Sequence, residues 1–144
     1  MKEVLKISTL ADLEMYAMLQ PSLEALFKKF GFDEKQATML VIAAEEVFAY
    51  CVKRIHSVKS KSRIAIGVIL DNPYLLIIIE HDGPRGSLEK HLMEGSEKKI
   101  ERTSFEALGL YIAREVIDEL RYTGFWGGKN EFTLMVKFPE SAKA

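Results

Sequence analysis

Cysteine is almost absent from this chain: Cys51 is the single one among 144 residues, so no internal disulfide can form. An excess of one charge is also missing, because 20 Lys and Arg face 21 Asp and Glu for a formal net charge of −1. This balance gives no reason to expect binding to nucleic acid or to an anionic membrane. No apolar run approaches the ~20 residues of a membrane span, and the opening MKEVLKISTL lacks the apolar segment of a signal peptide. A cytoplasmic protein is predicted.

Sequence signatures of phosphate loops and metal sites are missing as well. His56 and His91 have no Cys or Glu at ligand spacing, so no metal site is predicted. Internal repeats and linkers are absent, and 48% of the residues are hydrophobic, so we expect a single domain over residues 1–144. The glycines of the second half are spaced too irregularly for a P-loop or a Rossmann loop: Gly83, Gly86, Gly95 and Gly109.

The strongest helical pattern runs from Asp33 to Arg54. Asp33 and Gln36 have the spacing of a capping box, and no Gly or Pro interrupts the run. A stripe at four-residue spacing carries Ile42, Glu46, Tyr50 and Arg54. Apolar residues recur on another face, which we expect to be buried: Leu40, Ala44, Val47, Phe48, Cys51 and Ile55.

Glu46 is the residue of this helix that needs a chemical explanation. A carboxylate in an apolar helix costs free energy unless it has a partner or a function. It could pair with Arg54, two turns along the helix, or with a nearby lysine. The other interpretation is that Glu46 faces a cleft and acts there. That interpretation predicts that Glu46→Ala leaves folding nearly intact.

Strands and helices alternate along the rest of the chain. Pro21 should kink or split the first helix, and Gly31 should end it. Residues 58–62 are predicted to form a loop, and residues 139–144 a frayed tail. Alternating or apolar runs predict strands at 4–8, 63–70, 75–79, 120–125 and 131–138. Helical spacing predicts two further helices, one from Thr9 or Asp12 to Phe30 and one over 104–118.

The segment from His81 to Ser104 shows little periodicity and mixes Lys, Glu, Arg, Gly and Ser. A stretch of this length without regular structure inside a domain is often functional. One interpretation is a lid over a site, comprising residues 84–104. The other is a mobile charged surface loop, and the sequence leaves both open.

The order of elements predicts an α/β two-layer sandwich, with a mixed, mainly antiparallel sheet and helices on one face. Residues 75–79 are apolar on both faces of their strand. Because helices would cover only one face, the other face needs an apolar cover. We therefore expect a homodimer through the uncovered face.

Three motifs in this order resemble those of the GHKL (Bergerat-fold, histidine-kinase-like) ATPases, and among them the anti-sigma-factor serine kinases. They are Glu46 on the central helix, Asp-Gly-Pro after a central strand, and Leu-Gly-Leu followed by a helical pattern. The ending LGLYIAREVIDELRY before a Gly-Gly hairpin carries the resemblance furthest. It covers roughly residues 5–138. The resemblance implies ATP and Mg²⁺ as cofactors, with Glu46 as the base that polarises the attacking hydroxyl.

Several positions depart from that family pattern. Tyr50 stands where the family has its magnesium-binding Asn, and a phenol is a poor substitute for an amide oxygen. His81 stands where the family Asp accepts the adenine amino group, although a strand-end histidine is the plainer interpretation. Gly83 is retained, and it could form an ordinary turn with the proline after it. Arg85 replaces the second glycine of the loop.

The later motif departs too, since Ala107 replaces its first glycine while Gly109 and Leu110 remain. Thr103 and Glu106 have capping-box spacing, so we expect the helix to begin near Thr103 or Ser104. Gly109 would then lie inside the helix, where a carbonyl four residues back engages its N–H. An amide engaged in this way cannot hold phosphate.

Two functions are consistent with these residues. The first is an ATP-dependent protein-serine kinase that binds a sigma factor and phosphorylates its antagonist. The second is a catalytically inactive partner-binding module that has kept the fold and lost the Mg-ATP chemistry. Tyr50 at the magnesium position favours the second.

Overall fold

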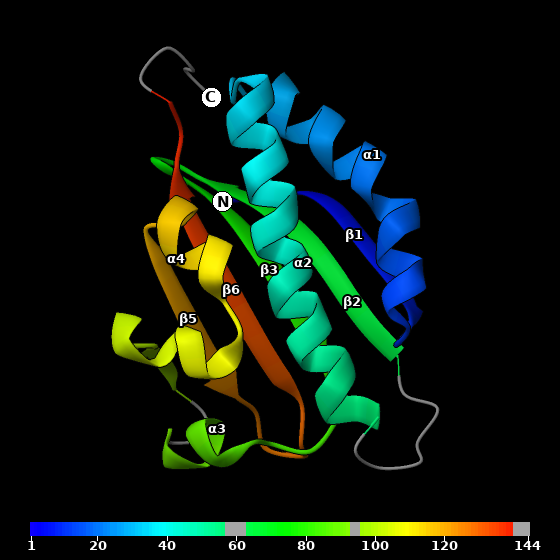
Figure 1. The fold of residues 1–144 in the computed structure, drawn as a ribbon, viewed down its shortest axis with the longest axis vertical. Coiled ribbons are helices and arrows are strands. Elements are labelled where there is room, and N and C mark those ends of the chain that lie inside the picture. The colour runs from blue at the N-terminus through cyan, green and yellow to red at the C-terminus, as the bar shows by residue number, and fades with distance from the viewer. Residues whose placement is uncertain (57–62, 93–95, 140–144) are drawn as a thin grey trace.

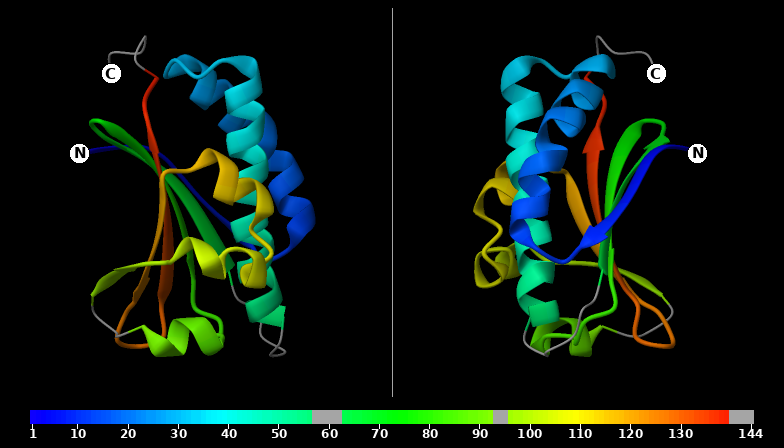
Figure 2. Two further views of the ribbon diagram at one scale, coloured as in Figure 1. Left: turned by 60° about the vertical axis from the view of Figure 1, so that its left-hand side comes forward. Right: turned by 90° about the vertical axis from the view of Figure 1, so that its right-hand side faces the viewer.

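The computed structural model describes residues 1–56, 63–92 and 96–139, which form an antiparallel sheet with helices packed on one face (Figures 1 and 2). The sheet order is β1-β2-β3-β6-β5-β4. The strands are β1 (Lys2–Leu10), β2 (Arg63–Asp71), β3 (Tyr74–His81), β4 (Glu97–Lys99), β5 (Glu119–Gly124) and β6 (Asn130–Lys137). The helices are α1 (Leu13–Lys29), α2 (Glu34–His56), α3 (Ser87–His91) and α4 (Tyr111–Val116), with 3₁₀ turns η1 (Arg102–Ser104) and η2 (Glu106–Leu108).

The predicted two-layer α/β sandwich is confirmed. The sheet differs from the prediction in one respect, because every strand pairing in the described part of the chain is antiparallel, with none of the parallel pairs that a mixed sheet would have. Hairpins explain two of the five pairings, since β2–β3 and β5–β6 are joined by short turns. Among the residues described, no helix has the length and apolarity to cross a membrane.

The central helix α2 follows its prediction closely. The Asp33 carboxylate accepts a hydrogen bond from the Gln36 N–H at 2.7 Å, and the Gln36 side chain accepts one from the Asp33 N–H at 2.9 Å. This reciprocal pair is the predicted capping box. In α1 the predicted split at Pro21 is wrong, because the helix runs unbroken through it. Buried side chains on both sides of the proline, Leu19 and Leu23, hold the helix to the core.

The core lies between α1, α2 and the inner face of the sheet, where Ile64, Ile66 and Val68 of β2 are fully buried. Tyr16 of α1 donates its hydroxyl to the Val41 carbonyl of α2 at 2.5 Å. This bond satisfies a hydroxyl that is entirely buried and ties the two helices together. The core therefore holds α2 in place, and with it the side chains on the stripe that carries Glu46 and Tyr50.

The outer face of the sheet carries both apolar and charged side chains. Strand alternation directs Leu76 and Ile78 of β3 outward, with Met135 of β6 opposite Leu76. Charged side chains on the same face pair with one another, as Glu80 does with Lys129 at 3.1 Å. The predicted homodimer through this face stays a prediction, which the molar mass in solution would test.

The second half of the chain holds two further corrections. The segment predicted as a lid contains α3 and β4, and β4 pairs with β5 at the sheet edge. The helix predicted over 104–118 is two 3₁₀ turns followed by the shorter α4. The loop predicted at 58–62 and residues 140–144 of the predicted tail lie outside the described residues.

Candidate functional site

A hollow of about 440 Å³ lies between α2 and the 3₁₀ turn η2. Four of the predicted site residues contribute to its walls, which brings the two family motifs of α2 and of residues 107–110 to one place. Its lining consists of Glu45, Glu46, Ala49, Tyr50, Lys53, Arg54, Glu106, Ala107, Leu108 and Gly109.

The Glu46 carboxylate is occupied by the first turn of α4. One carboxylate oxygen, Oε2, accepts the N–H of Tyr111 at 2.8 Å, and the other, Oε1, accepts those of Ile112 and Ala113 at 2.8 Å each. These N–H groups have no partner inside a helix, and the positive end of the helix dipole attracts a negative charge. Glu46 is therefore the N-terminal cap of a helix 65 residues away in sequence.

The other end of α4 is held in the same manner with the opposite charge. Arg102 donates from Nη2 to the carbonyls of Ile117 at 2.9 Å and Asp118 at 3.2 Å, and from Nη1 to that of Arg114. A cation is favourable at a helix C-terminus. Side chains from outside the helix thus cap both ends of α4, which has only six residues.

The predicted start of this helix near Thr103 or Ser104 is wrong. Gly109 adopts a left-handed backbone with φ of 75°, which ends the 3₁₀ turn before α4 begins. The predicted capping box does not form either, since Glu106 bonds to Arg114 at 2.9 Å. The Gly109 N–H is engaged, as expected, but by the Glu106 carbonyl three residues back at 2.9 Å.

The other two predicted residues of this motif lie on either side of the turn. Ala107 is exposed within η2, whereas Leu110 is buried with its N–H bonded to the Phe105 carbonyl at 2.9 Å. Neither residue therefore offers an amide to a ligand in the way that the family resemblance implies for a phosphate loop.

Tyr50 lines the hollow but is 9% exposed, because its ring and hydroxyl are packed among neighbouring side chains. Its hydroxyl donates to Glu89 at 2.5 Å, its ring meets Phe132 edge-on at 5.8 Å, and the Arg54 guanidinium lies 5.0 Å from the ring centre. Burial raises the pKa of Tyr50 above its ordinary value, and the bond to Glu89 raises it further. A protonated phenol held in this way has no character of a magnesium ligand.

Glu89, which the sequence interpretation missed, is the second carboxylate of the site. It belongs to α3 in the predicted lid, is 1% exposed, and accepts the Gly86 N–H at 2.6 Å in addition to the Tyr50 hydroxyl. A Cβ at Gly86 would lie 2.9 Å from that hydroxyl oxygen, so a larger residue there would displace the Tyr50 hydroxyl. The signal in the sequence was half of a capping box, a Glu three residues after Gly86.

His81 is a buried neutral histidine at the end of β3. It is 3% exposed, its Nδ1 accepts the Gly83 N–H at 3.0 Å, and its ring stacks on Phe132. This bond places the ring proton on Nε2, which has no hydrogen-bond partner within the described ranges. Burial lowers the pKa of His81 to about 4, so the ring is neutral at pH 7.

The expectation that Glu46 lies near His81 and Gly83 is wrong. A Cβ at Gly83 would lie 2.9 Å from the Ile55 side chain, and Ile55 is nine residues beyond Glu46, or about 13 Å along the helix. The strand end therefore meets the last turn of α2. Tyr50, through Phe132, is the nearer of the two residues to His81.

Arg85 anchors the β5–β6 hairpin and does not line the hollow beside Glu46. Its Nε donates to the Tyr122 hydroxyl and to the Asn130 side chain at 2.9 Å each, and its Nη2 donates to the Phe125 carbonyl at 2.8 Å. Asn130 in turn donates to the Gly83 carbonyl at 3.0 Å. The hairpin and the loop after β3 are thus one hydrogen-bonded unit, which no local pattern in the sequence indicated.

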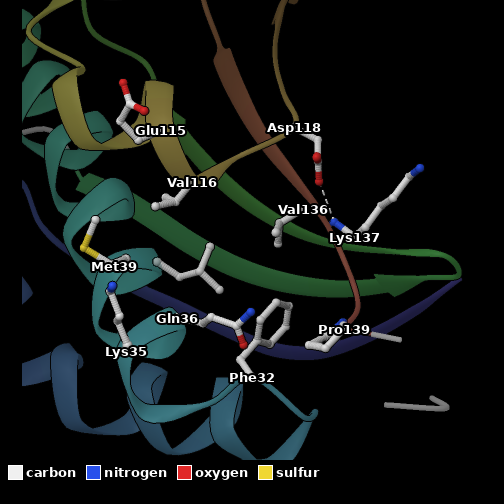
Figure 3. Close-up of a pocket in the computed structure, with 11 residues that line it drawn as sticks. Phe32, Lys35, Gln36, Met39, Glu115, Val116, Asp118, Val136, Lys137 and Pro139 are labelled. Atoms are coloured by element: carbon white, nitrogen blue, oxygen red, sulfur yellow. Dashed lines mark hydrogen bonds between the residues drawn. The ribbon is translucent and has the colours of Figure 1, made fainter. Parts of the chain in front are cut away.

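A separate hollow of about 570 Å³ lies at the N-terminal end of α2 (Figure 3). Phe32, Leu40 and Val136 give it an apolar floor, and the Asp118 carboxylate at its edge accepts the Lys137 N–H at 2.7 Å. None of the predicted site residues lines it. Four of the residues that the family resemblance assigns to ATP chemistry thus lie at the hollow beside Glu46 and not at this one.

The residues at that hollow do not fit magnesium or a nucleotide phosphate. Glu46 and Tyr50 use their oxygens within the protein, and the first amides of α4 are bonded to Glu46. Over the described ranges, no group of three or more His, Cys, Asp or Glu side chains is arranged to hold a metal ion.

The buried His81 predicts a pH-dependent stability. In the unfolded chain its pKa is about 6.5, and in the folded chain it is about 4. Between these values the unfolded state binds more protons than the folded state, so the free energy of unfolding decreases as the pH is lowered, by up to about 1.4 kcal/mol per unit. Urea unfolding should give a lower free energy of unfolding at pH 4.5 than at pH 7.5 in the natural chain, and this loss should be smaller in His81→Phe. Parallel curves for the two proteins would contradict the assignment.

Comparison with solved structures supports the fold and nothing more specific. No family model matches the sequence, and no curated protein matches it. The crystal structure of the RsbU and RsbW domains of Rv1364c from Mycobacterium tuberculosis matches with a TM-score of 0.62 over 97% of this chain, at 15% sequence identity. This chain spans about a third (34%) of the length of that protein. The fold is thus shared with a protein that contains an RsbW domain.

Proposed function

We propose that this chain is a regulatory protein of the anti-sigma-factor type that acts by binding a protein partner and does not transfer phosphate from ATP. The observation that carries the proposal is the Glu46 carboxylate, which accepts three backbone N–H groups at 2.8 Å each. A general base has to present a free oxygen to the proton that it removes. Both oxygens of Glu46 are engaged elsewhere.

The position of the Glu46 carboxylate at the N-terminus of α4 also disfavours the binding of ATP. The N-terminus of a helix is a natural site for a phosphate, because its free N–H groups and dipole favour an anion. In this chain Glu46 supplies that anion from within the protein. A phosphate would have to displace the carboxylate, and the displaced charge would then lie beside it. Like charges so close together repel one another, so the exchange is unfavourable.

The proposed partner is a sigma factor or the antagonist of one. Support comes from the resemblance of the motifs to anti-sigma-factor serine kinases and from the fold shared with an RsbW-containing protein. The alternative, an active ATP-dependent protein-serine kinase, requires Glu46 to leave α4 and Tyr50 to leave Glu89. The feature that favours this alternative is the hollow of about 440 Å³ beside Glu46, which could admit a ligand.

Thermal unfolding with and without 5 mM Mg-ATP tests the proposal directly. A ligand present at ~100 times its dissociation constant adds about 2.7 kcal/mol to the free energy of unfolding. We expect no change in Tm and no transfer of labelled phosphate to a serine of the partner. A Tm that rises with ATP concentration, together with phosphate transfer, would restore the kinase.

Replacing Glu46 should destabilise the protein, contrary to the expectation for a residue that only handles a ligand. Glu46→Ala leaves three N–H groups without their acceptor, and we expect a loss of about 2–3 kcal/mol and a Tm lower by about 5–10 °C. Glu46→Gln should lose less, because its amide oxygen can still accept the N–H groups of Ile112 and Ala113 while its NH₂ group would face the N–H of Tyr111.

The neighbouring Glu45 is the matched control for this measurement. It accepts one hydrogen bond, from Gln20 at 2.8 Å, and Glu45→Ala should cost no more than about 1 kcal/mol. Equal, small effects of the two substitutions would show that Glu46 does not cap α4 in solution.

A further inference from the structure

The tip of the β5–β6 hairpin displays the largest aromatic side chain of the protein to solvent. Trp126, the single tryptophan of the chain, is 80% exposed, and Phe125 beside it is 37% exposed. Single exposed apolar residues are common on protein surfaces. A tryptophan is different, because it is enriched among the few residues that supply most of the affinity of protein interfaces.

The backbone beneath Trp126 is held rigidly. The Phe125 N–H donates to the Lys129 carbonyl at 2.8 Å and closes the turn, while Gly127 and Gly128 take the positive φ values of 95° and 94° that the turn needs. Arg85 fixes the turn from below with its bonds to the carbonyls of Phe125 and Lys129. A side chain on a fixed backbone loses less entropy on binding, which favours affinity.

The surface next to the tip is hollowed and carries mixed charges. A hollow of about 430 Å³ is lined by residues of the turn, of the loop after β3 and of α3, with Asp82, Pro84 and Lys90 in its walls. The hairpin and α3 lie at the same end of the molecule in both sets of views (Figures 1 and 2). The tip therefore combines a protruding aromatic side chain with an adjacent hollow, and a folded partner can be complementary to both.

We propose that the β5–β6 hairpin tip is a docking element that inserts Trp126 into an apolar pocket of a protein partner. The inference rests on the proposed function and names the surface that it would use. The partner pocket has to accommodate an indole ring, offer an acceptor to the indole N–H, and carry few charges at its centre.

The charges around the tip favour a protein over a membrane or a nucleic acid. The Lys129 ammonium is paired with Glu80 at 3.1 Å and lies 5.6 Å from the centre of the Phe125 ring. At the adjoining hollow Asp82 lies with Lys90 and with Arg85, whose guanidinium donates to the carbonyls of Phe125 and Lys129. Binding to an anionic membrane or to phosphates needs a basic cluster with unengaged cations, and the residues described around the tip do not form one.

Site-specific photocrosslinking in the cells that encode the chain tests the proposal. The photoreactive probe is p-benzoylphenylalanine, placed in the full chain at Trp126 or, as a control, at Met18 of α1, which is 71% exposed. We expect one discrete protein adduct from position 126 and none from position 18. Excess natural chain should compete with the adduct, and excess Trp126→Ala chain should not.

The partner identified from that adduct is then purified for a quantitative measurement. Because Trp126 is the single tryptophan, its emission reports on the tip of the natural chain when a partner without tryptophan is titrated in, and binding should shift that emission to the blue and protect it from iodide. Affinities of the variants are compared by titration calorimetry, which needs no tryptophan. Trp126→Ala should weaken binding by about 30-fold or more, whereas Met18→Ala should leave it unchanged, with equal melting temperatures for all three proteins.

Each other result overturns the docking inference. An adduct with lipid points to a membrane, and an adduct of twice the chain mass points to a second copy. A partner that crosslinks from position 18 and binds Trp126→Ala normally leaves the proposed function standing and removes the hairpin from it. Absence of a protein adduct at both positions counts against the hairpin and the proposed function together.

Discussion

The contact between the Glu46 carboxylate and the first turn of α4 determines where α4 lies and whether its first amides are available to a ligand. Three N–H groups converge on one side chain of the central helix, and a six-residue helix is too short to be stable by its own hydrogen bonds. The position of α4, and with it the turn through Gly109, therefore depends on Glu46. Because the same amides would be the ones available to a phosphate, stabilising the fold and binding an anion are alternatives at this point.

The rest of the site follows the same principle, since groups of the chain satisfy one another where a ligand would otherwise be needed. Tyr50 donates to Glu89, and Glu89 accepts from Gly86 as well. His81 is neutral, buried and stacked on Phe132. These contacts leave the side-chain oxygens of Tyr50 and Glu89 engaged within the chain. They support the proposed function, in which the chain acts by binding a partner.

The sequence was sufficient for the parts of the structure that depend on local interactions. The limits of α2 and its capping box could be predicted because Asp33 and Gln36 are three residues apart. The strands could be predicted from their alternation, and the two-layer arrangement follows from the order of elements. The split at Pro21 could not be judged, because tertiary packing of Leu23 and its neighbours compensates for one lost hydrogen bond.

The candidate site was predicted less well, because its contacts join residues far apart in sequence. Glu46 was singled out correctly as a residue that needs a partner, but that partner is 65 residues away. Glu89 lies 39 residues from Tyr50 in a segment without periodicity. The start of α4 was misjudged because local propensity favoured Thr103, whereas the left-handed Gly109 and the distant Glu46 set the actual start at Tyr111.

The most direct test of the account is a titration of the ¹⁵N-labelled chain with Mg-ATP, followed by the amide signals of Tyr111, Ile112 and Ala113. If Glu46 holds these amides, their signals stay in place up to millimolar nucleotide, and they move when Glu46 is replaced by Gln. Saturable shifts of the three signals on addition of Mg-ATP to the natural chain would show that phosphate displaces the carboxylate, and would contradict the account.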